Sequence, residues 1–178
     1  MKRLALLAGA AGVAIALALP AGAASPAGGV RNASFEAGFA QWNVTIPAGA
    51  SATIVPGRVR QGGGNWFARI KTDGPGGGAS VDQTFWGDAG AKVTGFARFN
   101  DAESGSCSFI DSATVEIDGN AVFLADSCTT GSTGAVVWTY TLGYTGYHTI
   151  FGTAQNGVDD IVDSTLDMDA PLLTKITP

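Results

Sequence analysis

Histidine and cysteine are scarce in this sequence, and their scarcity excludes several kinds of chemistry. The 178 residues include one histidine, His148, and two cysteines, Cys107 and Cys128, which form no Cys-x-x-Cys motif. Structural zinc sites use four cysteine or histidine ligands, and this chain lacks them. No nucleophile motif accompanies His148, which lies in a predicted strand, so we interpret it as a structural residue rather than a catalytic base.

Closely paired acids, which glycoside hydrolases require, are also few. Asp159-Asp160 and the pair Asp101 and Glu103 are the candidates, and both pairs lie in predicted loops. Solvated acids are ordinary in turns, and a sequence does not define the carboxylate separation on which such hydrolysis depends. We therefore expect a protein that is not an enzyme.

Long hydrophobic runs are absent except at the N-terminus. Lys2 and Arg3 precede an apolar stretch from Leu4 to Leu19, and small residues follow it through Ala24. This order is typical of a signal peptide, and the run is short for a membrane span, which needs about 20 residues. We expect residues 1–24 to be a signal peptide and residues 25–178 to form one secreted domain that has no membrane contact after cleavage.

Positive charge is sparse in the expected domain. After residue 24 the chain has eight basic and fifteen acidic residues, a net charge of −7. Most of the basic residues stand apart in the sequence, at Arg58, Arg60, Arg69, Lys71, Lys92 and Arg98. Nucleic acid and anionic membranes need clustered positive charge, so we expect neither as a partner. An acidic balance is compatible with neutral sugars or divalent cations.

Glycine is abundant, with 26 residues, and short β-branched and aromatic runs alternate with turn-forming clusters. This spacing predicts an all-β sandwich or barrel, and no window after the N-terminal run has helical periodicity. We predict ten strands, at Trp42–Ile46, Ala52–Val55, Trp66–Lys71, Ser80–Trp86, Ala91–Asn100, Ala113–Asp118, Ala121–Ala125, Val136–Leu142, His148–Ala154 and Thr165–Asp169.

The clearest local prediction is a hairpin with a disulfide at its open end. Asp118-Gly119-Asn120 is a turn signal between two of the predicted strands. Cys107 and Cys128 flank this hairpin, and a cysteine pair in an exported chain predicts one disulfide. Closing the loop of about twenty residues between the two cysteines contributes about 3 kcal/mol to stability.

Three segments, in order along the chain, together resemble one family pattern. They are NASFEAG at 32–38 followed by Trp42, ASVDQTF at 79–85 with GAKVTGF at 90–96, and GYHTI at 146–150 with DSTLDMD at 163–169. This set resembles galactose-binding-like jelly rolls, a group that includes many bacterial carbohydrate-binding modules. The resemblance implies an antiparallel β-sandwich with two sheets of about four or five strands each. Ala170-Pro171 departs from the family pattern, which leaves the geometry of the last strand open.

The resemblance also implies a structural calcium ion, the one cofactor that we expect. In the resembling modules the acid of the opening segment and an aspartate of the last strand hold calcium together with backbone carbonyls. The matching residues are Glu36 and Asp169. Ca²⁺ takes about six to eight oxygen ligands, and two carboxylates with loop carbonyls fit that need. In the alternative, Glu36 accepts hydrogen bonds from backbone amides, and Asp167 and Asp169 are solvated.

Aromatic and planar polar side chains are the candidates for sugar binding, because sugars present C–H faces and hydroxyl groups. Trp66 and Trp86 adjoin loops and are the best candidates for exposed platforms. Trp138 is expected in the core; Tyr140 shares its face, and the two would form an extended platform if one were exposed. Further aromatic candidates are Tyr144 and Tyr147. Polar contacts are expected from neighbouring strands of the same sheet, at Gln83, Arg98 and Asn100.

Two functions stay open for such a protein. The first is a secreted, non-catalytic module that binds an extracellular glycan or cell-surface polymer through a sandwich face or loop-end aromatics. The second is an extracellular structural or adhesive surface protein that uses the same fold to contact proteins or cell wall. A fold does not by itself determine which applies. The sequence predicts neither the glycan nor the oligomeric state.

Overall fold

The structure is a computed structural model that describes residues 28–72, 78–102, 107, 110–157 and 163–174. All regular structure within these ranges is β-strand. No helix within these ranges is long and apolar enough to span a membrane. The predicted signal peptide, Glu103 and Asp159-Asp160 lie outside them. The strands are β1 (Asn43–Thr45), β2 (Ser51–Pro56), β3 (Trp66–Lys71), β4 (Gly78–Gly87), β5 (Lys92–Asn100), β6 (Ser112–Ile117), β7 (Asn120–Asp126), β8 (Val136–Thr141), β9 (Gly146–Gln155) and β10 (Thr165–Thr174).

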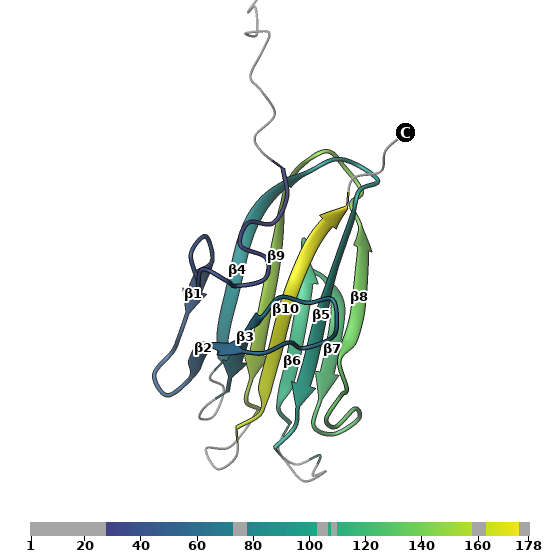
Figure 1. The fold of residues 1–178 in the computed structure, drawn as a ribbon. Helices are drawn as coiled ribbons and strands as arrows, with labels where there is room; N and C mark the ends of the chain where they lie inside the picture. Colours follow the sequence, from purple (N-terminus) through teal and green to yellow (C-terminus); the bar gives the residue numbers. More distant parts are fainter. Residues whose placement is uncertain (1–27, 73–77, 103–106, 108–109, 158–162, 175–178) are drawn as a thin grey trace, which may run out of the picture.

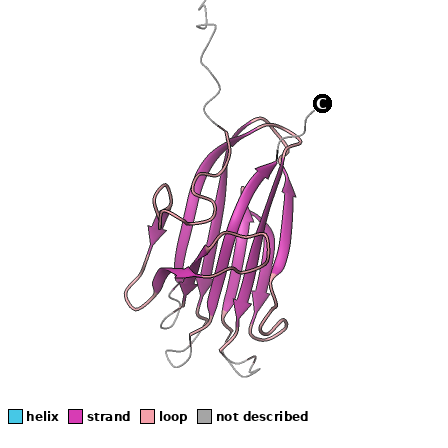
Figure 2. Ribbon diagram, viewed as in Figure 1, coloured by secondary structure: helices cyan, strands magenta, loops and turns pink. Residues whose placement is uncertain are grey.

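The strands form two five-stranded antiparallel sheets that pack face to face (Figures 1 and 2). Sheet A has the order β1-β4-β9-β6-β7, and sheet B has the order β2-β3-β10-β5-β8. The predicted all-β sandwich with about four or five strands in each sheet is therefore confirmed. Consecutive strands often change sheets: β4 is in sheet A and β5 is in sheet B. The order in space therefore differs from the order in sequence.

Alternating side chains from both sheets form the core. In β4, β5 and β6 every second residue is buried, which is the pattern of a strand with one face on the core. Phe35 of the N-terminal segment and Leu166 of β10 are both fully buried in this core. Each large apolar side chain buried in this way contributes about 1.5–3 kcal/mol. The N-terminal segment and β10 therefore meet in the folded domain, since Leu173 also lies against Gly29.

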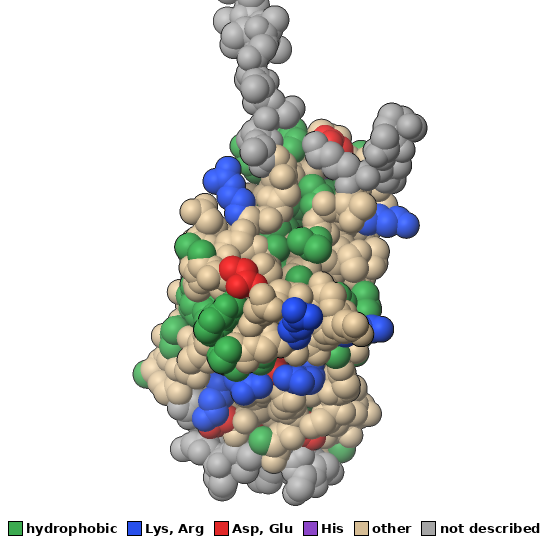
Figure 3. Space-filling view, in the orientation of Figure 1, with side chains coloured by type: hydrophobic (Ala, Val, Ile, Leu, Met, Phe, Trp, Pro, Cys, Tyr) green, Lys and Arg blue, Asp and Glu red, His purple; other side chains and the backbone are tan. Residues whose placement is uncertain are grey.

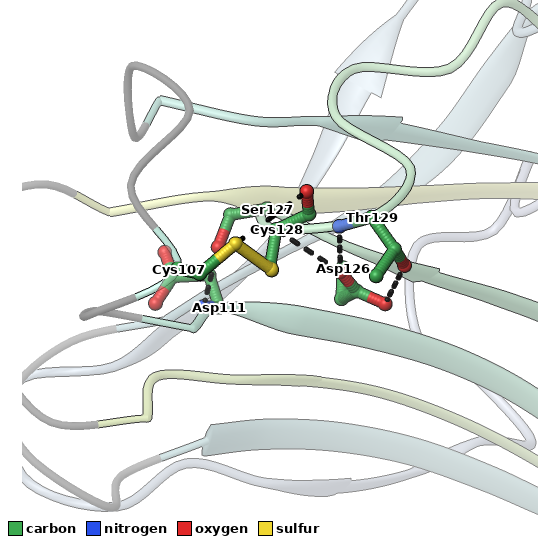
Figure 4. The surroundings of a disulfide bond; sticks show 6 residues. All are labelled: Cys107, Asp111, Asp126, Ser127, Cys128 and Thr129. Carbon is green, nitrogen blue, oxygen red and sulfur yellow. Dashed lines mark hydrogen bonds between the residues drawn. A yellow bond between two sulfur atoms is a disulfide. The ribbon is translucent and has the colours of Figure 1, made fainter.

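The β6–β7 hairpin turns through Asp118 and Gly119, which have φ angles of 51° and 76°. Two positive φ angles in succession suit the twist of a tight hairpin. At the open end of the hairpin Cys107 and Cys128 form a disulfide, with their Cα atoms 4.5 Å apart (Figure 4). Both predictions for this hairpin are confirmed.

Asp126, the last residue of β7, shapes the turn that carries Cys128 (Figure 4). Its Oδ1 atom accepts hydrogen bonds from the backbone N–H groups of Cys128, at 2.9 Å, and Thr129, at 2.5 Å. The Thr129 hydroxyl donates to Oδ2 at 2.6 Å. Hydrogen bonds from the Thr129 side chain and backbone lower the pKa of Asp126, because they stabilise the charged carboxylate.

Strand β10 extends five residues beyond the predicted end at Asp169. The register with β5 shifts between Asp169 and Leu172, and Ala170 has a φ angle of 44°. This is a β-bulge at the Ala170-Pro171 departure from the family pattern, and Pro171 is placed where it need not donate a ladder hydrogen bond.

Candidate functional site

Two aromatic rings meet on the outer face of sheet A. Trp86 of β4 and Tyr147 of β9 are directly paired in register. Their ring centroids are 5.1 Å apart at an interplanar angle of 86°, an edge-to-face contact. Tyr147 is 61% exposed, and Trp86 is half-buried. The two rings support each other, and Tyr147 presents an exposed aromatic surface to solvent.

A hollow of about 220 Å³ adjoins these rings. Its walls are Gly29, Arg31 and Gln41 of the N-terminal segment, residues 83–86 of β4, and Tyr147. The hollow thus lies between an aromatic pair, polar residues of the N-terminal segment and Thr84 of β4. Binding sites for small polar ligands combine apolar walls with a few polar groups in this way.

Gln83 holds the N-terminal wall of the hollow in place. Its side chain is almost fully buried, at 4% exposure. Its Nε2 atom donates to the carbonyls of Arg31, at 2.9 Å, and Gln41, at 3.0 Å, and its Oε1 atom accepts from the Arg31 N–H at 2.6 Å. These three hydrogen bonds fix the orientation of the buried Gln83 amide. Gln83 therefore positions the backbone beside the rings.

Polar and aromatic side chains continue along the outer face of sheet A. Asp82, Phe151 and Glu116 are paired in register across β4, β9 and β6. Asn43 of β1 donates a hydrogen bond from Nδ2 to Asp82 Oδ2 at 2.9 Å. Thr84 lies on β4 between Asp82 and Trp86. The face offers carboxylates, an amide and hydroxyls beside rings, which are the groups that bind sugar hydroxyls and C–H faces.

The predicted aromatic candidates occupy different parts of the molecule. Trp86 and Tyr147 lie together, as described above, whereas Trp66 is on β3 of sheet B and is 38% exposed. Trp138 is in the core at 3% exposure, as expected, so its extended platform with Tyr140 does not form. Tyr140 is half-buried, and its hydroxyl accepts a hydrogen bond from Asn120 Nδ2 at 3.2 Å.

The predicted grouping of polar contacts on one sheet is wrong. Gln83 is on β4 of sheet A and points into the core, whereas Arg98 and Asn100 are on the outer face of β5 in sheet B. The error arose because β4 and β5, although consecutive, belong to opposite sheets. Sequence reasoning also missed the roles of Arg31 and Asp82, which no local pattern marks.

His148 is fixed inside the protein, at 1% exposure. Its Nδ1 atom lies 2.6 Å from Asp118 Oδ2, and its Nε2 atom lies 3.1 Å from the carbonyl oxygen of Tyr144. The rings of Phe85 and Tyr144 pack against it, with centroids 5.7 Å and 4.3 Å away. Every polar contact of the ring thus ties the hairpin turn to the β8–β9 loop. This geometry fits the structural role that we expect for His148.

Glu36 and Asp169 approach each other around the glycine pair Gly63-Gly64. Glu36 Oε1 accepts a hydrogen bond from the Asn65 N–H at 2.8 Å, and Asp169 Oδ1 accepts one from the Gly64 N–H at 3.3 Å. Asp169 is fully buried, and its Oδ2 atom has no hydrogen-bond partner. Burial raises the pKa of Asp169, and the nearby Glu36 carboxylate raises it further, against the opposing effect of backbone hydrogen bonds.

Several oxygen atoms lie close to the glycine pair Gly63-Gly64 beside Asp169. A Cβ atom at Gly63 would lie 2.1 Å from Asp169 Oδ2 and 3.1 Å from the Arg60 carbonyl oxygen. A Cβ atom at Gly64 would lie 2.9 Å from the Ser34 carbonyl oxygen and 3.2 Å from Glu36 Oε1. Two carboxylates and two carbonyls lie at this glycine pair, and one carboxylate oxygen, Asp169 Oδ2, is buried and unpaired; such oxygen atoms are the ligands that Ca²⁺ prefers. Within the described ranges, no group of three or more His, Cys, Asp and Glu side chains could hold a metal ion.

Neither a protein-family model nor a curated protein sequence matches this chain. Several solved structures are similar to it. TmCBM61, solved in complex with β-1,4-galactotriose, aligns with a TM-score of 0.55 at 16% identity, over 83% of this chain and 97% of that one. The K3 cleaved adhesin domain of Lys-gingipain from Porphyromonas gingivalis W83 aligns with a TM-score of 0.53 at 15% identity, over 83% of this chain and 99% of that one.

A third similar structure is the enzymatically active domain of tailspike protein 4 from bacteriophage CBA120. Its TM-score is 0.51 at 16% identity, over 83% of this chain and 21% of that one. At these identities the likeness concerns the fold. Together with the two antiparallel sheets, these alignments show that this chain has a galactose-binding-like jelly-roll fold, which TmCBM61 shares.

Proposed function

We propose that this protein is a secreted, non-catalytic module that binds an extracellular glycan on the outer face of sheet A. The observation that carries the proposal is the Trp86–Tyr147 pair beside the 220 Å³ hollow. The fold shared with TmCBM61 supports it, because that protein binds a galactose oligosaccharide on the same kind of scaffold. The N-terminal apolar run and the disulfide support export.

The chemistry of the face suits a sugar with limited charge. A sugar ring placed on Tyr147 would bury C–H groups against the aromatic face, and its hydroxyls would meet Arg31, Thr84 and Asp82. Arginine and carboxylate groups bond hydroxyls with charge-assisted hydrogen bonds, which are about twice as strong as neutral ones. Asp82 and Glu116 on the same face disfavour an acidic sugar there.

Adhesion to proteins or cell wall is the second candidate function. It is favoured by the alignment with the Lys-gingipain adhesin domain, which covers nearly all of that domain. An adhesive protein would use the same fold without a sugar-stacking platform, so the two functions differ in their dependence on Trp86 and Tyr147.

The test is retention of the mature protein on a panel of insoluble and gel-embedded polysaccharides. We expect at least one polysaccharide to retain it, and Trp86→Ala and Tyr147→Ala to weaken that retention about tenfold or more, since each removes a stacked ring. Trp66→Ala is the matched control, because it removes a partly exposed tryptophan from the other sheet. No retention on any polysaccharide, or equal losses in Trp86→Ala and Trp66→Ala, would contradict the proposal.

We also propose that Glu36 and Asp169 hold a structural calcium ion. Such an ion would supply positive charge to the unpaired Oδ2 atom of Asp169 and would clamp three segments together: the N-terminal turn, the β2–β3 loop and β10. The site lies on sheet B, on the opposite side of the sandwich from Trp86, so its role is stability rather than sugar contact.

A further inference from the structure

Folding gathers most of the positive charge on one side of this acidic protein. The structure describes seven basic residues, and six of them lie on β3, on β5 or in the β2–β3 loop, all parts of sheet B. Figure 3 shows basic side chains over the β2–β3 loop, which crosses the outer face of sheet B (the crossing loop), and over the strands below it. The basic residues thus stand apart in the sequence but gather on one side of the folded protein.

The centre of this surface is a pair of arginines that share one carboxylate. Arg69 on β3 and Arg98 on β5 are both paired in register with Asp167, on β10 between them. Arg69 donates from Nε and Nη2 to the two oxygens of Asp167, at 2.7 Å and 3.0 Å. Arg98 donates from Nε and Nη2 to Oδ2, at 3.1 Å and 2.5 Å. Two guanidinium groups and one carboxylate leave one positive charge in excess.

The arginine pair is rigid and yet open to solvent. Asp167 is fully buried, whereas the side chains of Arg69 and Arg98 are 36% and 29% exposed. Both guanidinium groups lie over the ring of Phe67, 5.4 Å and 5.9 Å from its centroid. None of the hydrogen bonds found among the described residues uses the Nη1 group of either arginine. Each arginine therefore has an Nη1 group that is not used in these hydrogen bonds, while Asp167 and the Phe67 ring hold its guanidinium in position.

Further positive charge flanks the pair. Arg58 and Arg60 are exposed in the loop that crosses sheet B, and neither forms an ion pair with the described residues. Arg58 donates a hydrogen bond only to the neutral side chain of Asn65, at 2.9 Å. Lys71, two residues beyond Arg69, is paired with Asp163 and is neutralised. Glu36 and Asp169 accept hydrogen bonds from the N–H groups of Asn65 and Gly64 in the same loop and offset its two arginines, so the excess positive charge is centred on the pair Arg69 and Arg98.

We propose that this surface of sheet B, centred on Arg69 and Arg98, is a second binding site that takes the carboxylate groups of an acidic polysaccharide. A guanidinium presents its N–H groups in a fork that matches a carboxylate, and a pre-positioned fork loses little entropy on binding. The occupant carries widely spaced charges, because nucleic acid, with a charge about every 1.7 Å of duplex, needs a denser positive surface than this one. The site is independent of Trp86, which lies on the opposite sheet.

The test is calorimetric titration of the mature protein with oligogalacturonate, a carboxylate-bearing glycan, at low and moderate salt. We expect binding that weakens as salt rises, because exposed charges are screened. Arg69→Gln is expected to weaken binding about tenfold, the usual value of one charge-assisted hydrogen bond. Because this change leaves Asp167 less well paired, the double variant Arg69→Gln/Asp167→Asn removes the arginine without an unpaired carboxylate. The double variant keeps Arg98 as one excess positive charge, so we expect it to bind more weakly than the unmodified protein but more tightly than Arg69→Gln.

Two variants control for the position of the lost charge. Lys92→Gln removes a positive charge from the same face of β5, about 20 Å from Arg98 along the strand, and is expected to bind within about twofold of the unmodified protein. Trp86→Ala is expected to leave this titration unchanged. Absence of binding at low salt, an equal loss in Lys92→Gln, or loss in Trp86→Ala would overturn the proposal. Equal affinity for polyglutamate or single-stranded DNA would also overturn it.

Discussion

Gly95 and Trp138 face each other across β5 and β8 and show why a glycine stands in the middle of a strand. The two residues are paired in register, and both point into the core. A Cβ atom at Gly95 would lie 2.3 Å from the indole Cζ2 atom of Trp138, which is 3% exposed. The absence of a side chain at Gly95 therefore makes the space that the indole fills.

Replacing Gly95 with alanine is predicted to destabilise the protein. The added methyl group has to displace the Trp138 ring, and such overpacking costs about 1–3 kcal/mol. Thermal unfolding measures the effect. The matched control is Gly134→Ala, since a Cβ atom at Gly134 meets no atom within 4 Å. A Gly95→Ala melt equal to that of Gly134→Ala would show that the indole is not packed as described.

At the scale of an element, the β6–β7 hairpin is closed by its disulfide rather than by the core alone. Cys107 and Cys128 are 21 residues apart, and Cys107 lies outside both strands. Replacing both with serine is predicted to lower the free energy of unfolding by about 3 kcal/mol, because the unfolded chain regains the freedom of that loop. Chemical denaturation under oxidising conditions measures the change.

The same variant separates stability from binding. The hairpin lies at the β7 edge of sheet A, and Trp86 lies on β4, so glycan retention of the folded double serine variant is expected to be unchanged. A loss of retention at a temperature where the variant is folded would show that the hairpin belongs to the binding site.

Three elements meet at Glu36 and Asp169, and calcium is predicted to stabilise their junction. Addition of calcium at about one hundred times its dissociation constant contributes about 2.7 kcal/mol and raises the melting temperature. Glu36→Gln and Asp169→Asn are expected to lose this response, whereas Asp88→Asn, a change in an exposed turn, is expected to keep it. In chelator, Asp169→Asn is expected to melt no lower than the unmodified protein, because burial disfavours the charged carboxylate. A melting temperature unaffected by calcium and chelator would contradict the site.

Across the whole molecule, the sequence predicts the strands well and the surfaces poorly. Alternation of apolar and polar residues is local, so strands such as β6 could be located from their own residues. The ordered resemblance to jelly rolls also predicted the sandwich and the approach of Glu36 to Asp169. Features that form within one strand or one hairpin could therefore be predicted from the sequence.

Surfaces depend on which strands become neighbours, and no local pattern records that. Arg69 and Arg98 are far apart in the sequence and meet because β3 and β5 both pair with β10. Likewise, the face that carries Trp86 and Tyr147 exists only because β4 pairs with β9. The candidate aromatics could be named from the sequence, but their sorting into core, sheet A and sheet B could not.

The two proposed glycan sites, around Trp86 on sheet A and around Arg69 and Arg98 on sheet B, lie on opposite faces of the sandwich. Their ligands are therefore expected to bind independently. A neutral glycan on sheet A and an acidic glycan on sheet B would then be held together by one molecule. Independent binding means that saturation with one ligand leaves the affinity for the other unchanged.

Residue-resolved NMR of the mature protein, titrated with the glycan that retains it best, locates the sugar site directly. Backbone amide shifts are predicted to change on β4 and β9 around Trp86 and Tyr147 and in the N-terminal segment near Arg31, while those of β3 and β5 stay constant. Shifts confined to sheet B, or to the edge strands β7 and β8, would contradict the assignment of the outer face of sheet A as the glycan-binding surface.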